Sequence, residues 1–253
     1  MSLPDEQREV AAALTRLTGA TPIETHISAV FVGPEDAFKL KKAVRLPYAD
    51  FSTLAARRHF CGAEVALNRP HAPAVYRGVA AVTREADGTL ALDGRGPAVD
   101  YVVRMAPVPA NDFLDAVAAR GGLDGRMLDA LADAVFALHA AAPAAPGVDS
   151  AGWMARVLDG NREGCLEVGL DPARVETVVA DMRARLAALT PLLAARARDG
   201  HVRRCHGDLH LGNLLLWEGK PVPFDALEFD EDYARVDVGY ELAFLLMDLE
   251  VRV

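Results

Sequence analysis

The pattern of apolar and polar residues divides the chain into two parts, residues 1–105 and residues 106–253. In the first part, apolar residues at helical spacing alternate with short runs rich in β-branched and aromatic residues, which are typical of strands. The turn sequence GPED joins two of these runs and predicts a β-hairpin. The expected elements are helices at residues 4–19 and 52–68 and strands at residues 25–32, 37–44, 75–83 and 99–105.

The second part begins with the proline-containing connector APVPAND and continues with Ala and Leu at helical spacing. A strand pattern returns only on the two sides of EGK, which predicts a small hairpin. The expected elements are helices at about residues 112–120, 124–142, 152–167, 172–189 and 238–249 and hairpin strands at residues 213–217 and 221–224. The predicted fold class is therefore α+β and bilobal. Its N-terminal lobe has a small antiparallel sheet with one main helix, and its C-terminal lobe is mostly helical.

Composition excludes several classes of function. The 253 residues carry 27 Lys and Arg against 36 Asp and Glu, a net charge of −9, so we expect no nucleic-acid partner and no membrane partner. Three cysteines without CxxC spacing suggest neither a disulfide framework nor a zinc site, and reduced thiols fit a cytoplasmic protein. We also expect neither a signal peptide nor a membrane span, because no apolar stretch is long enough.

The stretch HGDLHLGN, residues 206–213, carries the most specific chemistry, and Asp225 follows it by twelve positions. Phosphoryl transfer needs a carboxylate beside the attacking hydroxyl and oxygen ligands for Mg²⁺. Asp208 is the candidate catalytic carboxylate, while Asn213 and Asp225 offer the amide and carboxylate oxygens that Mg²⁺ prefers. Asp208 alone is equally well explained as a turn residue, so the prediction depends on the whole set.

Two other polar residues, His206 and Asp237, have structural explanations. His206 and His210 have the spacing of zinc ligands on a helix, but the surrounding glycines favour a loop. We therefore expect His206 to brace this loop through a hydrogen bond to the backbone near Asp225. Asp237 directly precedes the last predicted helix, and we interpret it as a structural N-cap.

The sequence AFKLKK in the first part offers a basic group for phosphates. Strand alternation places Lys39 and Lys41 on one face, and a basic strand by itself is usually a solvated edge. Glu64, on the next predicted helix, changes this interpretation because it could hold a lysine against the α- and β-phosphates of ATP. Lys39 is the preferred candidate, and Lys41 is the alternative.

Taken together, HGDLHLGNLLL, FDALEFD, RVDVGYELA and AFKLKK with Glu64 resemble the aminoglycoside phosphotransferase family, which has a protein-kinase-like fold. Three segments are similar in sequence to members of a bacterial subgroup of this family: ETHISAVFV, AFKLKKAVRLPYADFSTL and ELAFLLMDLE. In that subgroup the kinase-like domain precedes a P-loop ATPase domain, often labelled gluconate-kinase-like. No GxxxxGK[ST] motif occurs in this sequence.

The resemblance implies an ATP- and Mg²⁺-dependent phosphotransferase with Asp208 as the catalytic base and Asn213 and Asp225 as the Mg²⁺ ligands. It implies that Lys39 binds phosphate with Glu64 as its partner, and that the segment around Arg104 and Met105 is a hinge whose backbone meets adenine. It also implies a P-loop ATPase domain or partner.

This sequence departs from the family pattern in three respects. It has no GxGxxG, it has Leu211 where proline is common, and it ends soon after MDLE, where family members continue, so we expect a C-terminal lobe that is cut short. The missing glycine loop and the domain pairing of the subgroup keep a second hypothesis open, a non-catalytic nucleotide-binding module that regulates a P-loop ATPase.

Spacing narrows the class of acceptor. Protein kinases place a peptide-binding segment of some tens of residues after the metal-binding Asp, whereas Asp237 follows Asp225 by only twelve positions. We therefore expect a small hydroxylated acceptor, such as an aminoglycoside or a sugar, and disfavour a protein kinase. Four acidic residues could attract a cationic acceptor, although such runs are usually solvated. They are Glu228, Asp230, Glu231 and Asp232.

Overall fold

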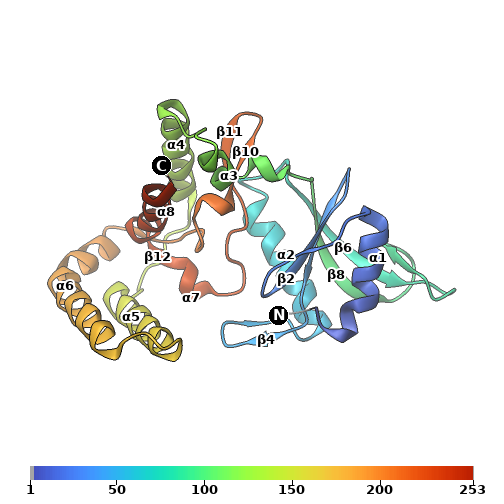
Figure 1. Ribbon diagram of the computed structural model, residues 1–253. Coiled ribbons are helices and arrows are strands. Elements are labelled where there is room, and N and C mark those ends of the chain that lie inside the picture. The colour runs from blue at the N-terminus through green and yellow to red at the C-terminus, as the bar shows by residue number, and fades with distance from the viewer. Residues whose placement is uncertain (1–2, 253) are drawn as a thin grey trace.

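A six-stranded sheet, antiparallel throughout, forms the first part of the protein in this computed structural model, which describes residues 3–252 (Figure 1). The strand order is β1-β2-β3-β8-β6-β7. A separate short hairpin, β4 and β5, follows β3. The strands are β1 (Ile23–Glu24), β2 (Ser28–Val32), β3 (Ala37–Lys41), β4 (Arg45–Leu46), β5 (Ala49–Asp50), β6 (Tyr76–Arg84), β7 (Leu90–Leu92) and β8 (Ala98–Met105).

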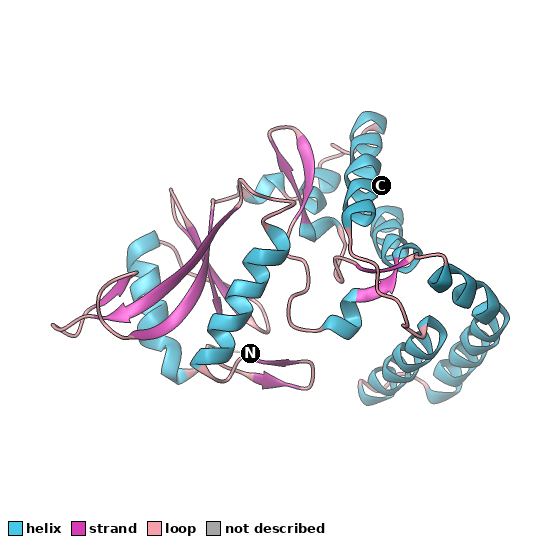
Figure 2. Cartoon of the chain, turned by 180° about the vertical axis from the view of Figure 1, so that it is seen from behind, coloured by secondary structure: helices cyan, strands magenta, loops and turns pink. Residues whose placement is uncertain are grey.

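Two helices cover opposite faces of this sheet, α1 (Arg8–Thr18) and α2 (Leu54–Asn68) (Figure 2). Side chains alternate along β3, so Phe38 packs with Leu14 of α1, while Ala37 packs with Cys61 of α2. Lys39 therefore points toward α2, as does Lys41. The predicted common face of the two lysines is confirmed.

A buried ion pair joins α2 to the sheet. Arg57 Nε donates to Asp100 Oδ1 at 2.7 Å, and Gln7 Nε2 donates to Asp100 Oδ2 at 2.8 Å. Both charged side chains are buried, so removing one leaves the other without its charge partner.

We expect Arg57→Met to lower the free energy of unfolding by roughly 3 kcal/mol, the usual effect of breaking a buried pair. Arg58→Met is the matched control, because Arg58 is exposed on the same helix. Urea denaturation of both variants measures the difference, and equal stabilities would contradict a structural role for the pair.

The second part is mostly helical. The helices are α3 (Leu114–Ala119), α4 (Gly125–Ala141), α5 (Ser150–Glu167), α6 (Pro172–Arg198), α7 (Glu231–Ala234) and α8 (Val238–Arg252), with short 3₁₀ turns η1 (Asp5–Gln7), η2 (Ala110–Asp112) and η3 (Leu211–Asn213) along the chain. Helices α5 and α6 pack on each other and project from the rest of this part (Figure 1). The expected α+β architecture, with an antiparallel sheet and a helical part, is confirmed.

Two short strand pairs interrupt the helices. The predicted hairpin is present as β10 (Leu214–Trp217) and β11 (Lys220–Pro223), and its turn places Glu218 and Gly219 at positive φ. The other pair, β9 (Val202–Arg204) with β12 (Arg235–Asp237), was not predicted. It brings together the segments that enter the HGDLHLGN stretch and α8, and so positions both.

Several predicted boundaries differ for local reasons. The strand predicted at residues 25–32 is β2 and begins at Ser28, because the hydroxyl of Thr25 accepts a hydrogen bond from Ser28 N and turns the chain there. Thr53 and not Ser52 caps α2, through a bond from Ala56 N at 3.1 Å. Helix α6 continues through Pro191 to Arg198. Its last turn is held by a contact between Arg196 and Asp237, which directly precedes α8 and is described below.

The three cysteines are free, as expected. Among the residues that the structure describes, no helix is long and apolar enough to cross a membrane.

Candidate active site

Lys39 connects the two parts of the protein. Its Nζ donates to Glu64 Oε1 at 2.9 Å and to Asp225 Oδ1 at 2.5 Å. Burial alone would lower the pKa of Lys39, but Asp225 and Glu64 raise that pKa well above its ordinary value. Lys39 is therefore a cation held between α2 and the segment that carries Asp225.

Lys41 occupies a different environment. It is fully buried and donates to Glu64 Oε2 at 2.6 Å and to Glu228. Lys39 retains some exposure, with 12% of its side chain accessible, whereas Lys41 retains 1%. The geometry favours Lys39 over Lys41 as the lysine that can meet a ligand.

The HGD loop, residues 205–213, presents Asp208 and Asn213 together. Asn213 Nδ2 donates to the backbone oxygen of Asp208 and to its Oδ2, each at 2.9 Å. These bonds orient the Asn213 amide, and no described residue donates a hydrogen bond to its Oδ1. They also occupy Asp208 Oδ2, near which His210 Nε2 lies at 3.7 Å, so Asp208 Oδ1 remains open.

The ionisation of Asp208 follows from the same neighbours. Partial burial would raise the pKa of Asp208, but His210 and Asn213 outweigh this effect and hold it below its ordinary value. The side chain is therefore a carboxylate at neutral pH, and 56% of it is exposed.

His206 braces the HGD loop as predicted. Its Nε2 lies 2.8 Å from the backbone oxygen of Phe224, and its Nδ1 accepts a bond from Asp208 N at 3.3 Å. Two further backbone bonds join this loop to residues 224–228, the FDALE segment: Leu227 N to His206 O and Phe224 N to Asn213 O. The loop and the segment are therefore one hydrogen-bonded unit, which brings Asp208 and Asp225 into the same neighbourhood.

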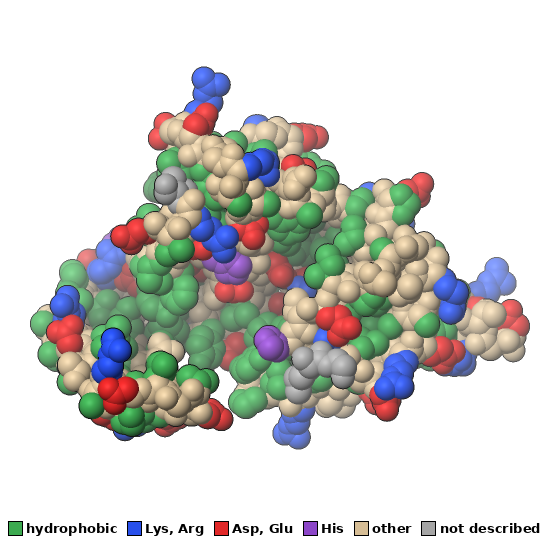
Figure 3. All heavy atoms as spheres, viewed as in Figure 1, with side chains coloured by type: hydrophobic (Ala, Val, Ile, Leu, Met, Phe, Trp, Pro, Cys, Tyr) green, Lys and Arg blue, Asp and Glu red, His purple; other side chains and the backbone are tan. Residues whose placement is uncertain are grey.

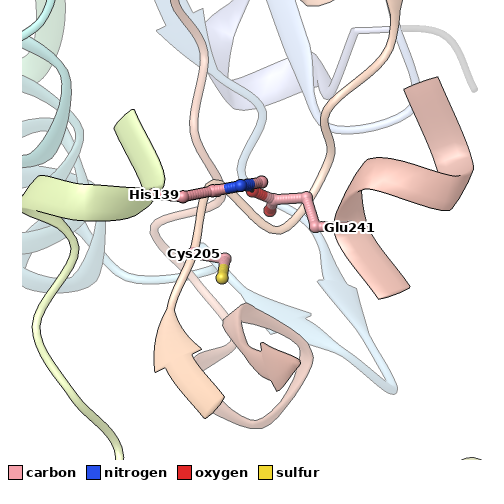
Figure 4. A group of neighbouring side chains, drawn as sticks. All are labelled: His139, Cys205 and Glu241. Carbon is pink, nitrogen blue, oxygen red and sulfur yellow. The ribbon is translucent and has the colours of Figure 1, made fainter. Parts of the chain in front are cut away.

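Two carboxylates of helix α8 hold the backbone of the HGD loop. Glu241 is buried, and its carboxylate accepts bonds from Gly207 N at 2.6 Å and from His139 Nε2 of α4 at 2.7 Å (Figure 4). Asp248, seven residues later on the same helix, accepts a bond from Leu211 N at 2.9 Å. The two carboxylates thus hold the backbone on both sides of Asp208.

Cys205 lies beside this pair, and the ligand atoms of His139, Cys205 and Glu241 lie within 4.8 Å of one another (Figure 4). Each group already has a protein partner, since the Cys205 thiol donates to Val236 O at 3.6 Å. Burial raises the pKa of Cys205 to about 12, so the thiol stays protonated. We interpret the group as a brace for the HGD loop.

Asp237 acts as the predicted N-cap. Its Oδ1 accepts a bond from Gly239 N at 2.7 Å. In addition, Arg196 of α6 forms two bonds with its carboxylate, at 2.7 and 2.8 Å, which the sequence did not indicate. This pair ties the end of α6 to the start of α8.

We expect acid to destabilise this arrangement. Burial would raise the pKa of Asp237 and Glu241, but Arg196 for the first and His139 with Gly207 N for the second hold both below their ordinary values. The unfolded chain then binds more protons in acid, so the free energy of unfolding should fall as the pH drops below about 4.

Urea denaturation across the acidic range measures this dependence. Asp237→Asn should flatten the pH profile, whereas Asp232→Asn should leave it unchanged, because Asp232 is exposed. A profile that is equally steep in Asp237→Asn would contradict the assignment.

Two predicted ligand-binding residues lie apart from these groups. Arg104 on β8 forms a two-bond pair with Asp36, and its backbone lies in the ladder with β3. Met105 is buried in the core cluster that contains Tyr76 and Val103. Neither side chain is open to a ligand, and the backbone of both residues is paired with β3 and with β6.

Most of the acidic run is already paired. Glu228 is buried against Lys41, Glu231 bonds with Arg204, and Asp230 caps α7. The run is therefore not a set of free charges for a cationic acceptor. Figure 3 shows instead a hollow between the sheet and the helical part, where acidic and histidine side chains gather.

Sequence reasoning missed the residues that support the site. Glu241 and Asp248 carried one usable signal, a spacing of seven residues, which places two carboxylates on one face of α8. His139 carried no comparable signal, because its partner lies 102 residues away.

The chain is similar in sequence to curated proteins from two mycobacteria. Uncharacterized proteins from Mycobacterium tuberculosis and Mycobacterium bovis are 28% identical to the chain over 235 residues, which is 90% of this chain and 45% of theirs. The chain thus spans about half the length of these curated relatives.

A solved structure shows the same fold. The aminoglycoside phosphotransferase APH(3'')-Id from Streptomyces rimosus, in complex with ADP and streptomycin, matches with a TM-score of 0.51 and 20% identity, over 96% of this chain and 84% of that one. The family model described as phosphotransferase enzyme family matches residues 44–250. With that match over most of its length and with this fold, the chain belongs to the phosphotransferase enzyme family.

Proposed function

We propose that the protein transfers the γ-phosphoryl group of ATP to a hydroxyl of a small molecule, with Mg²⁺. One observation carries the proposal. Asp208 accepts a bond from Asn213 at one oxygen and has its other oxygen open, and it lies next to the FDALE segment, where Asp225 bonds to Lys39 of β3. A carboxylate, an amide oxygen and a lysine in this arrangement match the parts that phosphoryl transfer needs.

The oxygens present fit Mg²⁺. Asn213 bonds to Asp208 through its Nδ2, and Lys39 bonds to Asp225 at Oδ1. Among residues 3–252, no hydrogen bond reaches Asn213 Oδ1 or Asp225 Oδ2. Both are hard neutral or anionic ligands of the kind that Mg²⁺ selects. When bound, the ion would neutralise charge on the β- and γ-phosphates.

The residues of the chain have separate roles in this reaction. Asp208 Oδ1 accepts the proton of the acceptor hydroxyl while the hydroxyl oxygen bonds to the γ-phosphorus. The bond from that phosphorus to the β–γ bridging oxygen breaks, and ADP leaves. Lys39, held by Glu64, contacts the α- and β-phosphates.

We further propose that the chain has two functional lobes, which meet at the end of β8. Residues 1–105 hold the nucleotide, with the backbone around Arg104 and Met105 as the adenine hinge, and residues 106–253 hold the HGD loop and the acceptor. Few residues separate the FDALE segment from α8, and α7 between them has four residues, which leaves little room for a peptide platform. A small acceptor, such as an aminoglycoside or a sugar, fits this space, and the structural neighbour binds streptomycin. The reduced thiols suit the cytoplasm.

An acceptor screen tests the proposal. ADP release is measured with Mg-ATP or Mg-GTP against pools of aminoglycosides, sugars, sugar acids and amino alcohols. We expect acceptor-dependent release that disappears with EDTA. Stabilisation by Mg-ATP without release for any pool would contradict turnover.

That contrary result would favour a second candidate, a nucleotide-binding module that regulates a P-loop ATPase domain or partner. Helix α8 presents apolar side chains that are about half exposed, which suits contact with another domain. They include Phe244, Leu246 and Met247. Addition of the protein to such an ATPase should then change the rate of ATP hydrolysis in a nucleotide-dependent manner.

A further inference from the structure

Two side chains of the sheet-bearing part hold the backbone of Asp225 and of Ala226, the residue after it. Asp225 N donates to the hydroxyl of Tyr76 on β6 at 3.1 Å, and Ala226 N donates to Asn68 Oδ1 of α2 at 2.7 Å. Tyr76 is 1% exposed and Asn68 is 2% exposed. Two successive amide groups of the FDALE segment therefore depend on the opposite part of the protein.

The conformation of Asp225 explains why such support is needed. Its φ is +61°, in the left-handed region that residues with a Cβ adopt rarely. The HGD loop bonds to the amides of Phe224 and Leu227, on either side of this pair. It leaves the amides of Asp225 and Ala226 to Tyr76 and Asn68.

Helix α2 combines this support with the lysine network. Asn68 lies one helical turn after Glu64, and its Nδ2 donates to Glu64 O at 2.9 Å. The same face of α2 thus holds Lys39 through Glu64 and the backbone N–H of Ala226, next to Asp225, through Asn68. A shift of α2 would release both contacts together.

We propose that Asn68 and Tyr76 are positioning residues that set the Asp225 carboxylate for Mg²⁺, an inference that rests on the proposed function. They act on Asp225 through the backbone N–H groups of Asp225 and Ala226 and touch neither the ion nor the phosphates. Their loss should weaken Mg²⁺ binding while nucleotide binding without the ion stays the same.

Tyr76→Phe removes one hydroxyl, and Asn68→Leu keeps the approximate side-chain shape without the polar atoms. Tyr101→Phe is the matched control, a hydroxyl deletion on β8 of the same sheet. The melting temperature is followed during Mg²⁺ titration with a non-hydrolysable ATP analogue, and amide hydrogen exchange is followed for the FDALE segment without ligands.

We expect both variants to lose about tenfold in apparent Mg²⁺ affinity, the effect of one hydrogen bond of ordinary strength. Faster exchange of the Asp225 and Ala226 amides should accompany it, with Tyr101→Phe unchanged. Unaltered Mg²⁺ affinity in Tyr76→Phe and Asn68→Leu, beside a wild type that binds Mg-nucleotide, would overturn the inference. A wild type that does not bind Mg-nucleotide would instead overturn the proposed function. If Asn68→Leu fails to fold, Tyr76→Phe alone decides.

Discussion

Asp208→Asn is expected to lower kcat by about 10²- to 10⁴-fold, the usual contribution of a general base. The reason is the open Oδ1 of Asp208, which in the proposed reaction accepts the hydroxyl proton, whereas an amide cannot. Asparagine can still accept the bond from Asn213, so the HGD loop should keep its shape. Dissociation constants for Mg-nucleotide should therefore change by less than about threefold.

Asp115→Asn is the matched control for this variant. Asp115 is a carboxylate at the start of α3 whose charge acts on His210, as that of Asp208 does, and its Oδ1 bonds to Ala116 N. Its kcat should stay near that of the wild type. Equal loss in both variants would indicate a general electrostatic effect and not a base at Asp208.

Asp225→Asn should have the second largest effect, a loss of at least about 100-fold in Mg²⁺ affinity and in kcat at fixed Mg²⁺. The carboxylate is ionised in the protein because Lys39 holds the pKa of Asp225 below its ordinary value although burial opposes this. Removing that charge removes the anionic oxygen proposed for the ion. Lys39 keeps Glu64 as a partner, so the protein should still fold.

Glu228→Gln serves as the comparison for Asp225→Asn. It removes one carboxylate from the same group of two lysines and three carboxylates, but not the oxygen proposed for Mg²⁺. Mg²⁺ titration of nucleotide-dependent melting should separate the two variants. If Glu228→Gln loses as much Mg²⁺ affinity as Asp225→Asn, then Asp225 contributes only its negative charge to this group and is not a specific ligand of the ion.

Local pattern was sufficient for much of the fold. The GPED turn, the EGK turn and the alternation in AFKLKK predicted hairpins and a common face for Lys39 and Lys41, because each depends on neighbouring residues. The pair of β9 and β12 was not predictable in this way. Each strand has three residues, and their partners lie about 30 positions apart.

The same distinction between local and distant contacts applies to the candidate site. Asp208 and Asn213 lie five positions apart in one loop, so the motif was enough to group them, and the structure shows that they bond to each other. Residues that act from distant helices had no such signal. Asn68 contacts a backbone group 158 positions away, and a side chain that binds backbone leaves no complementary residue to find in the sequence. The acidic run was considered as a site for a cationic acceptor for a related reason. The residues that pair with Glu228 and Glu231 come from β3 and β9, far away in the sequence.

The most direct test follows the γ-phosphate of labelled ATP in the presence of Mg²⁺ and the pooled hydroxylated acceptors. We predict that wild-type protein moves the label into a phosphomonoester of one acceptor. Asp208→Asn should bind Mg-ATP but transfer the label at least about 100-fold more slowly. The account would be contradicted if the label stayed in ATP although Mg-ATP binds. It would also be contradicted if the same phosphomonoester formed at the same rate in Asp208→Asn.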